Sequence, residues 1–290
     1  MTAGLWDHEI FVERLREIGG CAYHDKHPFH VAMNEGRLSP EAVRGWVANR
    51  FYYQRSIPVK DAAILSNCPL PEVRRVWIHR IADHDGVLPR AVESAVLSGQ
   101  AQSRTGRKFV EDNEHYSTEG GVEAWLRLGE ACGLSRAELI QDKNLQPGVR
   151  FAVDAYVNFA RTRPWPVAIA SSLTELFAPD LMAARIAAFE EFYPWIDPRG
   201  LDYFRRRVTQ ARRDSNEALE ITIEHCNTRE LQDAAVRALQ FKCDVLWSML
   251  DAIQHAYANI KERGFPSRPP PEISATGKPS LLVETHDYDS

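Results

Sequence analysis

Cysteines are few in this chain, and none are spaced as metal or redox pairs. The sequence holds 5 cysteines among 290 residues, an odd number, and they lie far apart with no C-x-x-C motif. This pattern argues against a disulfide framework and against a cysteine zinc site. Cysteines used as small apolar residues are typical of a reducing compartment, so the sequence predicts a cytoplasmic protein.

Several other signals of function are missing as well. No apolar run is long and uninterrupted enough to predict a membrane span, and residues 1–9 show no basic segment before an apolar run, so we expect no secretion signal. The phosphate-loop patterns G-x-x-x-x-G-K-[ST] and G-x-G-x-x-G do not occur. With 35 Lys and Arg against 40 Asp and Glu, the net charge of −5 argues against nucleic-acid binding.

Helical periodicity dominates the sequence, and alternating strand patterns are nearly absent. We therefore predict one all-α bundle of seven or more helices. The expected helices cover 7–19, 40–55, 58–68, 71–85, 119–133, 148–163, 179–192, 200–226 and 228–262. Glycine and proline mark their ends: Gly19-Gly20 should stop the first helix, Pro58 should begin a new one, and Gly86 should end the helix that Pro71 opens. Ser135 and Glu138 form a capping-box pattern.

Two segments do not follow the helical pattern. Residues 87–118 are polar and contain Gly99 and Gly106, which predicts a partly ordered insertion between two helices. Residues 264–290 begin with a proline-rich run and read as a disordered tail. The predicted organisation is a helical domain over 1–263, with the insertion 87–118 inside it, and the C-terminal tail 264–290.

The informative feature is where charges fall on the apolar stripes. At 100° per residue, four predicted helices each direct polar groups inward among apolar neighbours. These groups are Arg50 with Gln54, Arg80 with His84, Arg185, and Lys242. A single inward-facing cation can be explained without a ligand, because its aliphatic part lies along the core while its charged group reaches water. Four together predict a basic pocket inside the bundle, where arginine forks favour carboxylates. A small polycarboxylate is the predicted ligand.

Metal and nucleophile sites fit less well. His24, His27 and His30 are spaced by three, but Pro28 interrupts a continuous helix there. No E-x-x-H or H-E-x-x-H motif accompanies them, and Glu175 has no obvious partner carboxylate. We favour a capped turn with ordinary hydrogen bonds for His27 and His30. The pair 171–172 lacks the G-x-S-x-G turn of a serine nucleophile.

Seven segments occur in an order that matches a known family. They are 45–54 (GWVANRFYYQ), 57–63 (IPVKDAA), 83–86 (DHDG), 123–130 (EAWLRLGE), 153–156 (VDAY), 171–177 (SSLTELF) and 241–247 (FKCDVLW). The set spans about residues 10–260, leaves 87–118 unmatched, and resembles the pyrroloquinoline-quinone synthase family. This resemblance implies a heme-oxygenase-like bundle of about seven helices without heme, in a homodimer. It implies a cofactorless oxidase that closes the last ring of the quinone precursor AHQQ, oxidises it with O₂ and releases H₂O₂.

The resemblance also implies roles for residues at matching positions. His84 is similar to the catalytic acid–base histidine, and Tyr203 with Arg207 matches a pair beside oxygen or peroxide. Without the resemblance, that pair would read as an ordinary surface contact. His24 matches a substrate-binding position and is also a candidate catalytic residue. The remaining substrate-binding positions are Tyr23, Arg50, Gln54, Arg80, Tyr156, Thr174, Glu175, Arg185 and Lys242.

Two departures from the family pattern leave alternatives open. Met182 stands where some family members carry a histidine of the oxygen-side group, and a thioether cannot donate a proton. The insertion 87–118 could act as a longer lid, a partner surface or a block to closure. One alternative is a metal-dependent oxygenase of the same fold, with His24, His84 and Glu175 as ligands. Another is a non-catalytic protein that carries the quinone.

Overall fold

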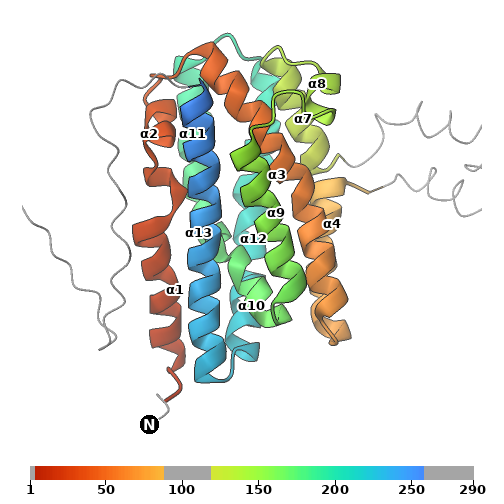
Figure 1. Ribbon diagram of the computed structural model, residues 1–290, viewed down its shortest axis with the longest axis vertical. Helices are drawn as coiled ribbons and strands as arrows, with labels where there is room; N and C mark the ends of the chain where they lie inside the picture. Colours follow the sequence, from red (N-terminus) through yellow and green to blue (C-terminus); the bar gives the residue numbers. More distant parts are fainter. Residues whose placement is uncertain (1–3, 88–118, 258–290) are drawn as a thin grey trace, which may run out of the picture. The chain divides into compact units, whose positions relative to one another are not determined.

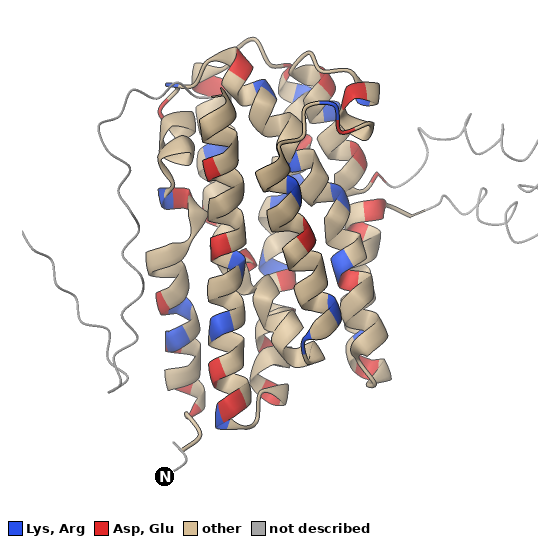
Figure 2. Ribbon diagram, viewed as in Figure 1, with Lys and Arg blue, Asp and Glu red and all other residues tan. Residues whose placement is uncertain are grey.

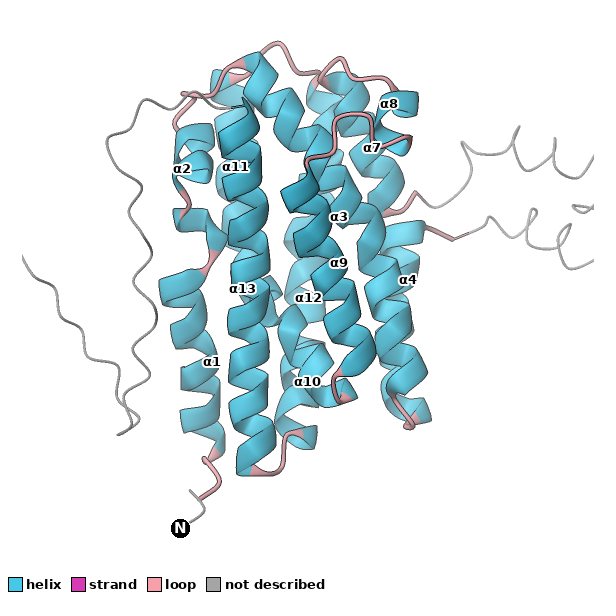
Figure 3. Ribbon diagram, viewed as in Figure 1, coloured by secondary structure: helices cyan, strands magenta, loops and turns pink. Residues whose placement is uncertain are grey.

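The computed structural model describes residues 4–87 and 119–257. Within these ranges the chain forms helices and loops without a β-strand (Figure 3), which confirms the predicted all-α class. The described residues belong to one compact unit, Met1–Ala258. Apart from Val87, the predicted insertion lies outside the described residues. The predicted tail and its boundary at 263 lie outside them as well, so these remain predictions.

Eight helices of eleven residues or more account for most of the described chain. They are α1 (His8–Ala22), α3 (Pro40–Asn67), α4 (Pro71–Asp85), α7 (Gly121–Ala131), α9 (Pro147–Thr162), α11 (Ala178–Phe192), α12 (Asp202–His225) and α13 (Arg229–Tyr257). Shorter helices are α2 (Pro28–Asn34), α8 (Arg136–Ile140) and α10 (Trp165–Ala170), with 3-10 turns η1 (His24–Lys26), η4 (Ser171–Phe177) and η5 (Pro198–Leu201).

The long helices lie alongside one another and share one core (Figure 1). α3 packs against α4, α7 and α9, while α13 packs against α1, α9 and α10, and α12 against α11 and η4. Inside, the ring of Trp46 on α3 lies 5.4 Å from that of Trp125 on α7 and 6.4 Å from that of Phe204 on α12. Burial of such large rings stabilises the bundle, and it holds three helices around the polar pocket described below.

Charges on the described helices alternate in sign rather than gather in one region (Figure 2). Many of them form ion pairs at the surface, for example Arg205 with Glu190 at 3.0 Å and Arg136 with Glu123 at 2.5 Å. Exposed pairs of this kind contribute at most about 1 kcal/mol each. The stability of the bundle therefore depends on its core, and the charges that matter for function are the buried ones.

Local sequence signals correctly predicted several helix ends. α4 begins with Pro71 and ends at Gly86, whose φ of 83° is a left-handed conformation that favours glycine. The Ser135 side chain accepts a hydrogen bond from the backbone of Glu138, and the Glu138 side chain accepts one from the backbone of Ser135, which confirms the capping box. Thr228 accepts from the backbone of Leu231 and so separates α12 from α13.

Two predicted helix boundaries are wrong. α1 continues through Gly19-Gly20 to Ala22, because Gly19 makes room for a neighbour instead of ending the helix. A Cβ on Gly19 would lie 1.9 Å from Cζ of Phe177 in η4. α3 likewise continues through Pro58. A proline inside a helix costs about 3 kcal/mol, and here the buried packing of α3 between α4 and α9 offsets that cost.

The stretch from Trp165 to Phe192 differs from the sequence-based expectation in two ways. Residues 165–177 were not predicted to be helical, yet α10, η4 and α11 follow one another without a break. Together they are long and apolar enough, with a mean hydropathy of 1.3, to cross a membrane by length and composition. However, 67% of that apolar window is buried inside the bundle. Core packing therefore accounts for the apolar character of this stretch.

The two adjacent glycines of α1 should respond oppositely to alanine. Gly19→Ala should lower the free energy of unfolding by about 1–3 kcal/mol, because the new methyl group collides with Phe177. Gly20→Ala should raise it by up to about 1 kcal/mol, because Gly20 is exposed and a Cβ there meets nothing within 4 Å. Urea denaturation measures both values, and equal effects would contradict the packing role of Gly19.

Candidate active site

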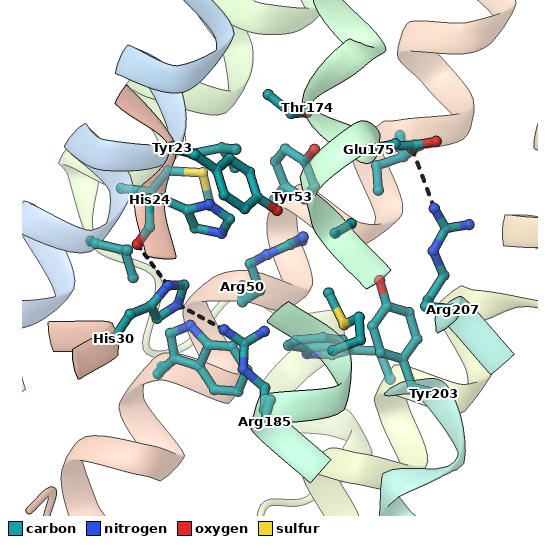
Figure 4. Close-up of a pocket in the computed structure, with 18 of the residues that line it drawn as sticks. Tyr23, His24, His30, Arg50, Tyr53, Thr174, Glu175, Arg185, Tyr203 and Arg207 are labelled. Atoms are coloured by element: carbon teal, nitrogen blue, oxygen red, sulfur yellow. Dashed lines mark hydrogen bonds and ion pairs between the residues drawn. The ribbon is translucent and has the colours of Figure 1, made fainter. Parts of the chain in front are cut away.

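A polar pocket, partly open to solvent, lies in the middle of the bundle. Its walls come from η1, α2 and η4 and from helices α3, α4, α7, α11, α12 and α13. Nine of the predicted site residues line it: Tyr23, His24, Arg50, His84, Thr174, Glu175, Arg185, Tyr203 and Arg207. Figure 4 shows most of them converging from separate elements.

Two arginines in the pocket have no carboxylate partner within the described chain. Arg50 lies against the ring of Tyr53, with 3.8 Å between its Cζ and the ring centre. Arg185 Nη2 lies 3.1 Å from His30 Nε2 (Figure 4). Arg50 Nη1 and Arg185 Nε are buried without a hydrogen-bond partner. Burial, together with the charge of Arg50, lowers the pKa of Arg185 to about 10. Such unpaired buried cations favour an anionic ligand.

Two neutral histidines lie beside these arginines. His30 Nδ1 is 2.9 Å from the backbone oxygen of His24, so Nδ1 carries the proton and Nε2 accepts from Arg185. Burial and the charge of Arg185 lower the pKa of both His24 and His30. His24 Nδ1 is buried and unpartnered. His27 instead caps α2 by accepting from the backbone of Phe29, which confirms the capped turn, whereas His30 extends into the pocket.

Six buried or nearly buried charges form a balanced cluster at one side of the pocket. This charge cluster consists of Lys60, Arg80 and Arg207 with Asp61, Glu175 and Asp214. Arg80 binds both oxygens of Glu175, at 2.8 and 2.7 Å. Although burial opposes ionisation, the charges of Arg80 and Arg207 hold the pKa of Glu175 well below its usual range. Three buried cations match three acids, and the half-exposed Arg213 pairs with both Asp214 and Asp83. The uncompensated positive charge that lines the pocket therefore comes from Arg50 and Arg185.

Lys242 lies behind the pocket wall and contacts the pocket through tyrosines. Its Nζ donates to the Tyr53 hydroxyl at 2.5 Å and lies 3.6 Å from the ring centre of Tyr156. The two tyrosine rings are parallel to within 4°. Burial and repulsion from Arg50 lower the pKa of Lys242 well below its usual value. Lys242 therefore positions the Tyr53 hydroxyl, which does line the pocket.

Gln54 lies behind His84 and joins it to Tyr203. Gln54 Nε2 is 2.8 Å from His84 Nδ1, and the Tyr203 hydroxyl donates to Gln54 Oε1 at 2.8 Å. Burial, followed by the charges of Arg207 and Arg80, lowers the pKa of His84, so its ring is neutral near pH 7. Its Nε2 is buried and has no hydrogen-bond partner. Tyr203 and Arg207 are both buried, unlike an ordinary surface contact.

Four predicted substrate-binding residues do not line the pocket. Gln54, Arg80, Tyr156 and Lys242 are buried just behind it and contact residues that face it. Their direct contact with a ligand remains a prediction.

Other residues of this region are not predicted from the sequence: Tyr53 and His30 in the wall, and Lys60, Asp61 and Asp214 in the charge cluster. Helical spacing could have indicated the two aspartates, because each follows a predicted site residue by seven positions on one helix.

The donor set of a metal-dependent oxygenase is not assembled here. In residues 4–87 and 119–257, no group of three or more His, Cys, Asp or Glu is arranged to hold a metal ion. The carboxylate of Glu175 already binds Arg80 and contacts Arg207. The proposed ligands His24, His84 and Glu175 therefore do not fit a metal as they are placed.

Stability should decrease as the pH falls from 7.5 to 5.5. His24, His30 and His84 each have a lowered pKa in the folded protein. The unfolded chain binds protons at these rings near pH 6.5, whereas the folded chain binds them only at lower pH. The unfolded state therefore holds more protons in this window, and each ring lowers the free energy of unfolding by about 1 kcal/mol per pH unit. Urea titrations at several pH values measure how the free energy of unfolding changes with pH. His84→Asn removes one of the three rings and should reduce this pH dependence by about a third.

Residues 12–252 match the TENA/THI-4/PQQC family. A pyrroloquinoline-quinone synthase of Cronobacter sakazakii is 52% identical over 238 residues, covering 82% of this chain and 84% of that protein. One of Pseudomonas aeruginosa is 52% identical over 257 residues, covering 89% and 91%.

A solved domain of unknown function from Shewanella denitrificans, with a heme oxygenase-like fold, aligns with a TM-score of 0.61. Its sequence identity is 12%, and the alignment covers 90% of this chain and 100% of that chain. At this identity the likeness concerns the fold alone, and it confirms the predicted heme-oxygenase-like bundle.

Proposed function

The chain belongs to the TENA/THI-4/PQQC family, and from this premise we propose that it is an oxidase that makes pyrroloquinoline quinone. The substrate is the quinone precursor AHQQ, and the enzyme closes its last ring and oxidises it with O₂, releasing H₂O₂. Relatives that are about half identical over most of the chain carry the name of this activity. The fold and the pocket chemistry agree with that assignment.

The observation that carries the proposal is the pair of unneutralised arginines. Arg50 and Arg185 are held in the pocket without a carboxylate partner in the described chain, and each has a buried nitrogen without a hydrogen bond. A precursor with several carboxylates supplies the missing acceptors. The charge cluster is already balanced, so it does not compete for the substrate. Binding by fixed guanidinium groups also orients the precursor for ring closure.

His84 is the proposed base. Its neutral imidazole lines the pocket, and its Nε2 makes no hydrogen bond within the described residues. With its own proton on Nδ1, it uses Nε2 to remove a proton from a ring carbon of the bound precursor. The resulting carbanion is conjugated with the quinone and passes electrons to O₂, so the substrate supplies the redox chemistry.

Tyr203 and Arg207 are the proposed oxygen-side pair. They lie one turn apart on α12, both are buried, and both line the pocket. A hydroxyl donor and a fixed cation stabilise the negative charge that develops on reduced oxygen. Met182 also lines the pocket, and it cannot supply a proton. We therefore assign proton delivery on this side to Tyr203.

We propose that the reaction needs no metal or organic cofactor, with O₂ as co-substrate. The engagement of Glu175 by Arg80 and Arg207, which leaves His24, His84 and Glu175 unassembled as metal ligands among the described residues, supports this. The decisive experiment is an aerobic single-turnover reaction of purified, metal-analysed protein with AHQQ, followed by absorbance and a peroxide assay. Mature quinone and peroxide from metal-free protein are the expected products.

The same experiment separates the alternatives. Turnover that rises in proportion to added metal would favour the metal-dependent oxygenase. Tight binding of AHQQ without oxidation would favour the quinone carrier. An anaerobic reaction serves as the control for O₂, since the proposed chemistry stops without an electron acceptor.

We also propose that the protein is a cytoplasmic homodimer. Ile140 on α8 is 54% exposed and Phe151 on α9 is 79% exposed, and the Arg150–Asp142 ion pair links their segments. Exposed apolar side chains on two linked segments favour association with another surface, and a two-fold dimer is the commonest arrangement. Sedimentation velocity measures the oligomeric state.

A further inference from the structure

Three buried side chains form a continuous hydrogen-bonded chain with both ends at the pocket. The Tyr203 hydroxyl on α12 donates to Gln54 Oε1 on α3, and Gln54 Nε2 contacts His84 Nδ1 on α4. Both distances are 2.8 Å. Gln54 is fully buried, and the other two side chains are at most 4% exposed. Tyr203 and His84 line the pocket, whereas Gln54 does not. The amide of Gln54 is therefore shielded from solvent and touches both groups that face the substrate.

The amide can satisfy this chain in two orientations. As the structure has it, the NH₂ group donates to His84 Nδ1, so a neutral ring carries its proton on Nε2. Rotation by 180° exchanges the oxygen and nitrogen, and the terminal torsion of glutamine allows both positions. Oxygen then accepts from Nδ1–H of His84, and the NH₂ group donates to the Tyr203 oxygen. No hydrogen bond is lost, but the proton of His84 moves to the other nitrogen.

The two orientations give the pocket different chemistry. In the first, His84 presents an N–H at Nε2 and the Tyr203 hydroxyl is held by Gln54. In the second, His84 presents a lone pair at Nε2, and the Tyr203 hydroxyl is free to donate into the pocket. Only the second orientation allows His84 to take a proton at Nε2. The imidazolium that forms carries a proton on Nδ1 as well, and in this orientation the Gln54 oxygen accepts a hydrogen bond from it.

The charges around His84 make this acceptor necessary. Arg207 on α12, Arg80 on α4 and Lys60 on α3 disfavour a positive ring, and Glu175 on η4 favours it. Among the described residues, Gln54 is the hydrogen-bond partner of the ring, and no carboxylate bonds to it. The amide oxygen is thus the group positioned to stabilise a protonated His84.

We propose that Gln54 is a positioning residue whose amide orientation decides which ring nitrogen of His84 carries the proton, and so switches His84 between donor and base. The same rotation releases the Tyr203 hydroxyl toward the pocket. This inference rests on the proposed function, since it concerns the protonation of the proposed base. It assigns Gln54 a role through His84 rather than through contact with the substrate.

Gly121, the first residue of α7, packs directly on this chain. A Cβ there would lie 2.9 Å from Gln54 Nε2, 3.1 Å from His84 Nδ1 and 3.4 Å from Tyr203 Cε2. Contacts near 3 Å are too close for a Cβ unless its neighbours move. The absence of a side chain at 121 therefore lets the backbone of α7 cover the hydrogen bond between Gln54 and His84. A substitution at Gly121 therefore disturbs the hydrogen bonds among Tyr203, Gln54 and His84 without changing any of these three residues.

The test is the protonation site of the His84 ring, read from ¹H–¹⁵N correlation spectra of free protein with ¹⁵N-labelled histidine. The wild-type ring should carry its proton on Nε2, as the donor arrangement of the structure requires. Gln54→Glu, as a carboxylate, only accepts hydrogen bonds and should move the proton to Nδ1. Gln54→Met offers neither donor nor acceptor and should leave a mixture. Gly121→Ala should also give a mixture, because the methyl group displaces the amide.

Kinetics give the second readout. Gln54→Met should lower the single-turnover rate with AHQQ by about 10²-fold, as loss of tautomer control does in other histidine-based enzymes. The dissociation constant for AHQQ should change less than about 3-fold, because the methionine stays behind the pocket. A residue that only filled space would leave the protonation site unchanged in both Gln54 variants.

The outcomes distinguish this inference from the proposed function. If the wild-type protein fails to oxidise AHQQ but the ring proton moves as described, the proposed function fails and the switch stands. If the wild-type protein is active and the Gln54 variants and Gly121→Ala all keep the wild-type protonation site, the switch is overturned. Should one Gln54 variant fail to fold, the other and Gly121→Ala still decide the question.

Discussion

Replacing His84 with asparagine should reduce the oxidation of AHQQ by about 10²–10⁴-fold, the usual contribution of a general base. Asparagine is polar, uncharged and smaller, so it leaves the basic pocket and its arginines in place. It has no lone pair that can accept a proton near pH 7. Binding of AHQQ should therefore stay within a few-fold of the wild type. Stopped-flow absorbance gives the rate, and equilibrium titration under anaerobic conditions gives the affinity.

His27→Asn is the matched control for this substitution. His27 is as buried as His84 but does not line the pocket, and its Nδ1 caps α2. Asparagine is itself a good helix cap, so this variant should fold and turn over at close to the wild-type rate. Wild-type turnover by His84→Asn would remove His84 from the mechanism and leave another group as the base.

The sequence was most informative where a helix end depends on one residue. Gly86 adopts a positive φ that few other residues tolerate, and the Ser135 capping box depends on neighbours three residues apart. Gly19 and Pro58 failed as boundary signals because their effect depends on what packs against them. Nothing local to Gly19 indicates that the ring of Phe177, 158 positions later, occupies the space of its missing side chain.

The site was predictable in composition but not in its internal pairing. Stripe positions placed Arg50 and Arg185 in the pocket, and the resemblance added Tyr203. The same stripe reasoning treated Arg80 as a ligand-binding group. The structure instead pairs Arg80 with Glu175 from η4, a segment that showed no helical pattern. Which cation meets which acid depends on how helices face each other, and periodicity within one helix does not contain that information.

Arg80→Met should be the most destabilising of the substitutions considered, lowering the free energy of unfolding by about 3–5 kcal/mol. Removing one partner of a buried ion pair leaves the other charge without compensation. Arg80 is 1% exposed and contacts all three acids of the charge cluster. Its loss leaves Lys60 and Arg207 as the buried cations facing three carboxylates, while the half-exposed Arg213 contacts Asp214 alone. Chemical denaturation at pH 7.5 measures the difference from the wild type.

Arg205→Met is the matched control, because Arg205 pairs at the surface with Glu190 and Asp202, and all three side chains are 40–55% exposed. That substitution should cost less than about 1 kcal/mol. A similar cost for both variants would mean that the charge cluster contributes no more than a surface pair.

The pH dependence of the Arg80→Met deficit tests the cause of the instability. Burial and repulsion from Glu175 already raise the pKa of Asp214 in the wild type, and loss of Arg80 should raise it further. A folded state that binds a proton more readily than the unfolded chain gains stability as the pH falls. The difference between variant and wild type should therefore shrink between pH 7.5 and 5.5.

The added substitution Glu175→Gln, which restores the balance of two buried cations and two acids, should recover part of the lost stability at pH 7.5. A deficit that neither low pH nor this second change reduces would point to lost packing of the arginine stem instead of an unbalanced charge.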